Sequence, residues 1–139
     1  MKSLCQHLRA TLLCAALVAA PALAGGSDPL FVNLTSNDGH RANMALTFSG
    51  KQMELGHPLT VFLNDKGVFL ASKANAGEFA EQQKAIEGLI EKGATVIACP
   101  MCMKHYGVAE GDLLPGIKIG NPEMTGGALF QDNAKTLTW

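Results

Sequence analysis

The residues best placed to do chemistry are two cysteines in the motif Cys99-Pro100-Met101-Cys102. A thiolate is both a nucleophile and a soft metal ligand. In an exported protein such a pair is first interpreted as a disulfide. A bond across a two-residue gap closes almost no loop, however, so it adds little stability by restricting the unfolded chain. The motif therefore favours reactive sulfur over a structural disulfide.

The position of the motif favours negative charge on Cys99. The apolar run Ala94–Ala98 predicts a buried strand directly before it, and Pro100 suits the first position of a helix. At a helix start, unpaired N–H groups and the helix dipole stabilise a thiolate. Cys102, one turn further on, is placed to resolve whatever forms on Cys99. We predict that Cys99 and Cys102 are the catalytic pair.

Four further polar residues are predicted to support this pair. Lys104 and His105 follow the motif directly and would add positive charge, while His40 and Asn64 come after the first and second predicted strands. In an open parallel α/β sheet, ligands bind beyond the carboxyl ends of the strands. We therefore expect these four side chains to lie at the same edge as the cysteines.

Metal binding is an alternative use of the same residues. Cys99, Cys102 and His105 are soft ligands at C-x-x-C-x-x-H spacing, and the thioether of Met103 would suit Cu(I). No second C-x-x-C or H-x-x-H completes a closed zinc site, so a fourth Zn(II) ligand would come from elsewhere in the chain. A haem-attachment motif is excluded, because Met103 stands where C-x-x-C-H requires histidine.

A dithiol–disulfide oxidoreductase is the third reading of the pair. The C-P-x-C spacing also occurs in glutaredoxin-like proteins, but thioredoxin-like folds place the motif after their first strand. Here it follows the third predicted strand. The position of the motif therefore argues against a thioredoxin-like fold, but it does not exclude dithiol–disulfide chemistry.

Short apolar runs alternate with helical patterns along the chain. Apolar runs without polar alternation, separated by helices, favour a parallel sheet covered on both faces. Asn75, with Glu78 three residues on, is the predicted cap of the clearest helix. Residues 68–70 are expected to form a brief extended segment or to cover a pocket. The predicted strands are 29–34, 59–63, 94–98, 117–119 and 135–139. The predicted helices are 40–50, which ends at Gly50 or one turn later, 78–92, 100–106 and 122–131.

The N-terminus has the pattern of a cleaved signal peptide. A basic leader precedes an apolar run over residues 10–20, and Pro21 then comes before the A-x-A site Ala22-Leu23-Ala24. This run is shorter than the roughly 20 residues that a membrane-spanning helix needs. We therefore predict a signal peptide over residues 1–24, a single domain over residues 25–139, a periplasmic location and no membrane attachment after cleavage.

Composition excludes some classes of partner. The formal net charge is −1, and the lysines are scattered singly along the chain. This argues against a nucleic-acid-binding surface. No sequence pattern calls for a bound cofactor, apart from the Cu or Zn of the metal alternative.

Several segments, in their order along the chain, resemble the DsrE/DsrF-like sulfur-relay family. The resemblance extends from about Pro29 to Trp139. It rests on Leu30-Phe31-Val32-Asn33-Leu34-Thr35, Val61-Phe62-Leu63-Asn64-Asp65 followed by Gly67-Val68, Gly93-Ala94-Thr95-Val96 leading into Cys99, Gly107-Val108, and Leu113-Leu114-Pro115-Gly116.

This resemblance implies a three-layer α/β/α fold with a mostly parallel five-stranded sheet, assembled as a homo-trimer or homo-hexamer. It also implies that sulfur is carried as a persulfide on a cysteine after the third strand. That position matches Cys99, with Cys102 as the second candidate. The chain departs from the familiar relay proteins in two ways, because they are cytoplasmic and often use one cysteine here.

We therefore predict a periplasmic sulfur carrier, sulfurtransferase-like if it is active as an enzyme. Its partners would be sulfur donor and acceptor proteins or small sulfane-sulfur compounds. The soft-metal protein and the dithiol oxidoreductase remain the alternatives.

Overall fold

A computed structural model describes residues 26–139, so the predicted signal peptide lies outside the described residues. Short strands alternate with helices, as the apolar runs predict. The elements in chain order are β1 (Leu30–Leu34), α1 (Gly39–Glu54), β2 (Leu59–Leu63), η1 (Asp65–Ala71), η2 (Lys73–Asn75), α2 (Ala76–Glu91), β3 (Thr95–Ala98), α3 (Pro100–Tyr106), η3 (Glu110–Asp112), β4 (Lys118–Ile119), α4 (Pro122–Leu129) and β5 (Lys135–Thr138), where η marks a 3₁₀ helix.

The strands form one five-stranded sheet in the order β4-β3-β2-β1-β5, and every neighbouring pair is parallel. The prediction of a mostly parallel five-stranded sheet is therefore confirmed. Leu34 pairs with Leu63, and Leu63 pairs with Ala98. Because β1, β2 and β3 end level with one another, the segments that follow them begin at one edge of the sheet.

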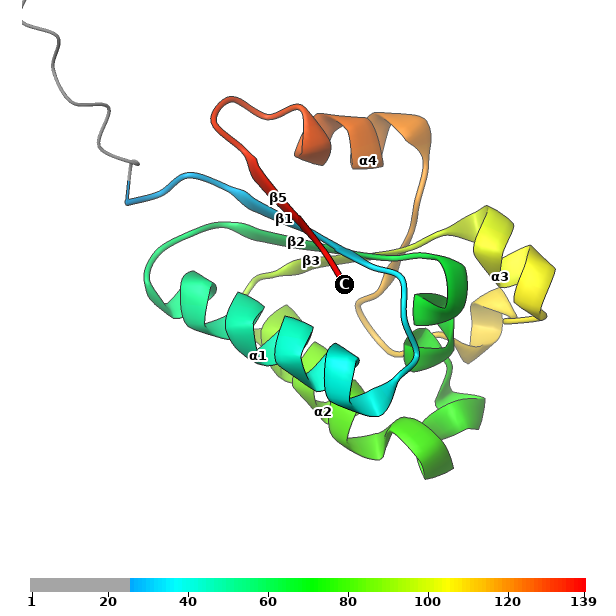
Figure 1. Cartoon of the computed structure of the whole chain (residues 1–139). Helices are drawn as coiled ribbons and strands as arrows, with labels where there is room; N and C mark the ends of the chain where they lie inside the picture. Colours follow the sequence, from blue (N-terminus) through cyan, green and yellow to red (C-terminus); the bar gives the residue numbers. More distant parts are fainter. Residues whose placement is uncertain (1–25) are drawn as a thin grey trace, which may run out of the picture.

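Helices lie on both faces of the sheet. α1 and α2 lie side by side on one face, α4 lies on the opposite face, and α3 extends beyond the carboxyl end of β3 (Figure 1). The face under α1 and α2 carries the main core. Its fully or nearly fully buried members include Val32, Leu34, Leu46, Val61, Leu63, Leu70, Ile86, Leu89 and Val96.

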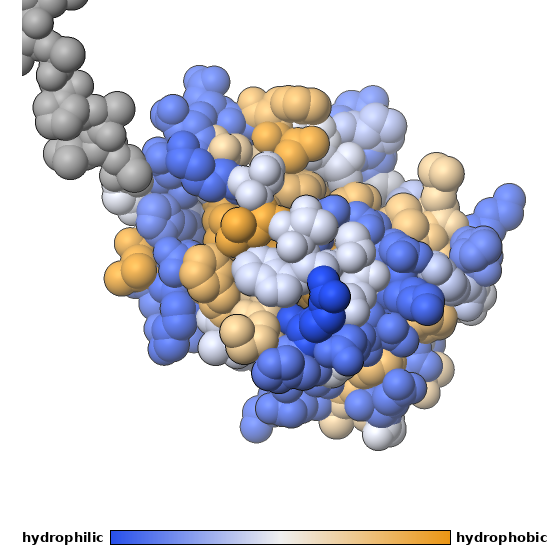
Figure 2. All heavy atoms as spheres, in the orientation of Figure 1, coloured by the Kyte–Doolittle hydropathy of each residue, from blue (hydrophilic) through white to orange (hydrophobic). Residues whose placement is uncertain are grey.

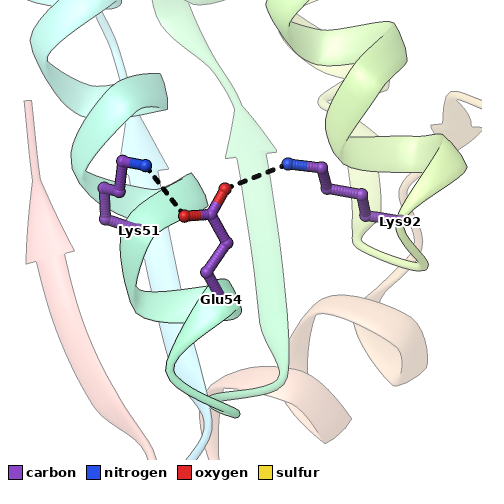
Figure 3. Close-up of polar contacts among 3 residues, drawn as sticks. All are labelled: Lys51, Glu54 and Lys92. Carbon is purple, nitrogen blue, oxygen red and sulfur yellow. Dashed lines mark hydrogen bonds and ion pairs between the residues drawn. The ribbon is translucent and has the colours of Figure 1, made fainter.

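α1 begins where the sequence predicts and runs one turn past Gly50. The Asp38 carboxylate caps it by accepting the Arg41 N–H at 2.8 Å. Near its end, Glu54 accepts hydrogen bonds from Lys51 at 2.8 Å and from Lys92 at 3.1 Å (Figure 3). Lys92 directly follows α2, so this exposed contact joins the ends of the two helices on the main face.

Two local predictions need correction. Asn75 occupies the N-cap position of α2, as predicted, but its side chain does not cap the helix, because its amide donates to the Phe69 carbonyl at 3.0 Å and so ties the start of α2 to η1. Residues 68–70 are not extended but belong to η1, where Val68 and Leu70 are fully buried. Among the described residues, no helix has the length and apolar character needed to span a bilayer.

Asp112 joins the turn before α2 to the segment after α3, and this makes stability depend on pH. Its carboxylate accepts hydrogen bonds from the Ser72 hydroxyl and from the Ala74 N–H, which lower the pKa of Asp112 from its ordinary value of 3.8. A carboxyl group whose pKa is lower in the folded than in the unfolded state stabilises the fold at pH values above its unfolded pKa. This contribution is lost as the pH falls through the folded pKa.

We therefore expect Asp112→Asn to unfold at lower denaturant concentration than the wild type at pH 7. The difference should shrink as the pH falls below 3.8, because the wild-type carboxylate then takes up its proton. Urea unfolding between pH 7 and pH 3 measures this, with the exposed Asp132→Asn as the matched control. A difference between wild type and Asp112→Asn that stays constant over this range would exclude the contribution.

Candidate functional site

The two cysteines lie where β3 passes into α3. The backbone of Cys99 is still extended, with φ −73° and ψ 114°, and its N–H donates to the Leu63 carbonyl of β2 at 2.9 Å. Pro100 then occupies the first turn of α3, as predicted. The strand thus delivers Cys99 to the carboxyl edge of the sheet, and the turn of helix brings Cys102 back over it.

The two thiols are in direct contact. Both are free and half-buried, and their Sγ atoms lie 2.7 Å apart. The Cys102 thiol donates to the Cys99 sulfur, which also accepts the Cys102 main-chain N–H at 3.3 Å. Cys99 therefore receives two hydrogen bonds at its sulfur, which is the arrangement that stabilises negative charge there.

The Cys102 thiol holds its proton more firmly than an ordinary cysteine thiol does. Burial raises the pKa of Cys102 above its ordinary value, and the hydrogen bond to Cys99 raises it further. A hydrogen bond from the Asp65 N–H to the Cys102 sulfur, 3.1 Å long, acts in the opposite direction and lowers this pKa. The pair is thus unequal, with Cys99 as the acceptor of hydrogen bonds and Cys102 as a protonated donor.

Asp65 and Tyr106 complete the site, although the sequence analysis did not select them. The Tyr106 hydroxyl donates to the Asp65 carboxylate, and this bond raises the pKa of Tyr106. The Tyr106 ring also packs against Phe69 of η1, with ring centroids 5.1 Å apart. The sequence places Asp65 directly after the second predicted strand, but it does not show that this strand lies beside β3 in the sheet.

The four predicted supporting residues do not gather around the thiols. Lys104 and His105 are exposed in the last turn of α3, and the His105 ring lies edge-on to Tyr106. Asn64 donates its side-chain amide to Asn33, and His40 is exposed in the first turn of α1, two strands away from β3. Among the described residues, no hydrogen bond or ion pair joins any of the four to either cysteine.

The ligands of the metal alternative are not assembled either. Across residues 26–139, no group of three or more His, Cys, Asp or Glu side chains lies close enough together to hold a metal ion. Met103 is only 3% exposed and packs against Val68 and Ala98. Its side chain therefore lies in a small core under α3, against which both cysteines also pack.

With this geometry in place, the comparisons with known proteins are informative. The model of the DsrE/DsrF-like family matches residues 30–135. This chain belongs to the DsrE/DsrF-like family. The match spans the whole sheet apart from the last residues of β5, and it includes the C-x-x-C motif.

Curated relatives of this DsrE/DsrF-like chain include two uncharacterized archaeal proteins. It is 36% identical over 80 residues to one from Methanopyrus kandleri and 35% identical over 80 residues to one from Methanocaldococcus jannaschii. Each match covers 57% of this chain, and the matches cover 66% and 70% of the two relatives. The chain thus spans just under two thirds of the length of the first relative.

Solved structures share the fold at lower sequence identity. A protein of unknown function from Methanobacterium thermoautotrophicum aligns with a TM-score of 0.63 and 15% identity, covering 80% of this chain and 98% of that one. The ychN protein of E. coli aligns with a TM-score of 0.59 and 18% identity, covering 81% and 99%. At such identities the likeness establishes the α/β fold.

Proposed function

We propose that this protein is a sulfur carrier that holds sulfane sulfur as a persulfide on Cys99. The observation that carries the proposal is the unequal thiol pair, in which the Cys99 sulfur accepts two hydrogen bonds and Cys102 donates both. The Cys99 thiolate would attack the sulfane sulfur of thiosulfate or a polysulfide. With thiosulfate, an S–S bond to Cys99 forms, the original S–S bond breaks, and sulfite leaves with the electron pair.

Cys102 supplies the route for release. Its thiolate would attack the Sγ atom of the Cys99 persulfide and form a Cys99–Cys102 disulfide. The outer sulfur leaves as hydrogen sulfide and takes the proton that Cys102 lost, so atoms and charge balance. The 2.7 Å separation of the sulfur atoms supports this step, because a disulfide bond of about 2.05 Å then needs only a small movement.

Mass spectrometry of the intact protein tests the loading step. After mild reduction and brief incubation with thiosulfate or polysulfide, quenched by alkylation before sulfide is released, we expect the wild type to gain the mass of one sulfur atom, mapped to Cys99 by peptide analysis. Cys99→Ala should gain none, because it lacks the nucleophile. Equal uptake by Cys99→Ala, or no uptake by the wild type under any reductant, would reject the carrier function.

The short separation of the two sulfur atoms also favours a second candidate, a dithiol–disulfide oxidoreductase. This function predicts a reduction potential well above the roughly −300 mV of structural disulfides, and no stable persulfide. A soft-metal protein would instead show Cu(I) or Zn(II) that survives desalting and is lost in Cys102→Ser. The same mass spectra separate the three functions.

The proposal extends to location and partners. We place the mature domain, residues 25–139, in the periplasm after removal of the signal peptide, with sulfur donors and acceptors as its partners and no nucleic acid or resident cofactor. We also propose a homo-trimer or homo-hexamer. Exposed apolar side chains at the end of α4 support self-association, since Phe130 is 83% and Leu129 is 36% exposed. Figure 2 shows apolar surface over this helix among hydrophilic neighbours.

A further inference from the structure

Asp65 lies where the segment after β2 meets the thiol pair. It follows Asn64 at the carboxyl edge of the sheet, beside the end of β3. Its main-chain N–H points at the Cys102 sulfur from 3.1 Å. This donor comes from η1, a different segment from the helix that carries both cysteines, so the Cys102 sulfur is held between two elements.

The backbone of Asp65 has a conformation that few residue types adopt. Its φ is +44°, in the left-handed region, and Asn133 is the only other non-glycine residue with positive φ in the described part of the chain. Aspartate and asparagine tolerate this region better than other side chains that carry a Cβ. The residue type at position 65 therefore determines how easily the chain can turn from β2 into η1 with this N–H aimed at Cys102.

The side chain of Asp65 fixes the same turn from the other side. Its carboxylate accepts the Tyr106 hydroxyl, and Tyr106 lies on α3 four residues after Cys102, on the same face of the helix. The Phe69 ring packs on Tyr106 from η1. One residue thus makes two contacts with α3, through its N–H to Cys102 and through its carboxylate to Tyr106.

We infer that Asp65 is the positioning residue for sulfur release, which holds Cys102 for its attack on the Cys99 persulfide. This inference rests on the proposed carrier function and assigns a role within it. Negative charge develops on the Cys102 sulfur when it loses its proton to begin the attack. The Asp65 N–H is already in place to stabilise that charge, as a fixed donor at the site where charge appears.

The reaction that Asp65 assists is the release step alone. The persulfide on Cys99 and the thiol of Cys102 become a Cys99–Cys102 disulfide and hydrogen sulfide, with no added oxidant or reductant. The Cys102 sulfur is oxidised, the outer sulfur is reduced, and the proton passes from the first to the second. Loading uses Cys99 and not Cys102 as the nucleophile, so substitutions at Asp65 should slow release more than loading.

Three variants separate the parts of this role. Asp65→Asn keeps a residue that tolerates positive φ and an oxygen that can accept from Tyr106. Asp65→Ala keeps the N–H but loses the acceptor, and alanine tolerates the left-handed conformation at φ +44° less well than aspartate does. Tyr106→Phe leaves Asp65 intact and removes only the hydroxyl that holds it. Thermal unfolding of each variant reports whether the fold is kept.

The experiment loads each variant with polysulfide, removes excess reagent and follows sulfide release at several pH values. We expect release to be about tenfold slower in Asp65→Ala and about threefold slower in Tyr106→Phe at pH 7, with the release profile moved to higher pH in both. Asp65→Asn should stay within about twofold of the wild type. An unchanged rate and profile in Asp65→Ala, or a loss in Asp65→Asn as large as in Asp65→Ala, would overturn the inference.

A second measurement does not depend on sulfur loading. In a Cys99→Ser background, alkylation of Cys102 by iodoacetamide against pH reports how well its thiolate is stabilised. Adding Asp65→Ala should move the midpoint up by about one pH unit, a tenfold change in the acid dissociation constant. Loss of the aimed N–H contact should outweigh removal of the carboxylate, whose negative charge by itself raises the pKa of Cys102. If the wild type takes up no sulfur but this midpoint moves, the carrier function fails while Asp65 still positions Cys102. If the midpoint does not move, the role of Asp65 is rejected.

Discussion

Cys102→Ser is expected to load sulfur on Cys99 and then to retain it. A serine hydroxyl at this position keeps the size and the N–H that donates to Cys99, but it cannot attack a persulfide at neutral pH. The wild-type thiol reacts as an intramolecular group in contact with its target, and such groups have effective concentrations of about 10⁵ M or more when well oriented. Millimolar thiols in solution cannot replace it.

The expected result is sulfide release slowed by about two orders of magnitude or more in Cys102→Ser, without loss of the loaded mass. Timed mass spectra of the persulfidated protein measure this, with methylene blue detection of the sulfide that leaves. Met101→Leu is the matched control, because Met101 lies inside the motif but is 82% exposed. Release from Cys102→Ser at the wild-type rate would show that another group resolves the persulfide.

Gly67→Ala is expected to produce the largest loss of stability. Gly67 is buried in η1, and its N–H donates to the Thr35 carbonyl at 3.2 Å and to the Asn64 carbonyl at 2.8 Å. A Cβ on this residue would lie 2.1 Å from the Leu34 carbonyl oxygen. The obstacle is backbone at the end of β1, so it cannot swing aside as a flexible side chain could.

We expect Gly67→Ala to lower the free energy of unfolding by about 3 kcal/mol, and the Tm by about 10 °C or more. Because Gly67 anchors the 3₁₀ helix that carries Asp65, sulfide release should slow as well. Gly88→Ala is the control, since a Cβ there meets nothing within 4 Å, and alanine should stabilise α2 by up to about 1 kcal/mol. Chemical denaturation measures the free energy of unfolding of both variants. Equal values for Gly67→Ala and Gly88→Ala would show that the Leu34 carbonyl does not obstruct a Cβ at position 67.

Local sequence patterns were sufficient to predict the sheet and the pairing of the two thiols. The apolar runs lack polar alternation because the parallel strands are covered on both faces, and this predicted the architecture. The pairing of Cys99 with Cys102 was also predictable, because both lie within one turn of helix and local geometry alone brings them together. The closing strand and the position of Pro100 followed from equally local patterns.

The residues that surround the thiols could not be predicted in this way, because they depend on the order of strands in the sheet. Asp65 reaches Cys102 across 37 residues and Tyr106 across 41, because the strand order places β2 beside β3. His40 follows β1, which lies one strand further away, so a polar residue at the correct edge of the sheet is still absent from the site. Asn75 shows the same effect on a helix cap, since its side chain bonds to Phe69 instead. Local patterns determine which elements form, whereas the order of strands in the sheet determines which of the segments that follow them can touch.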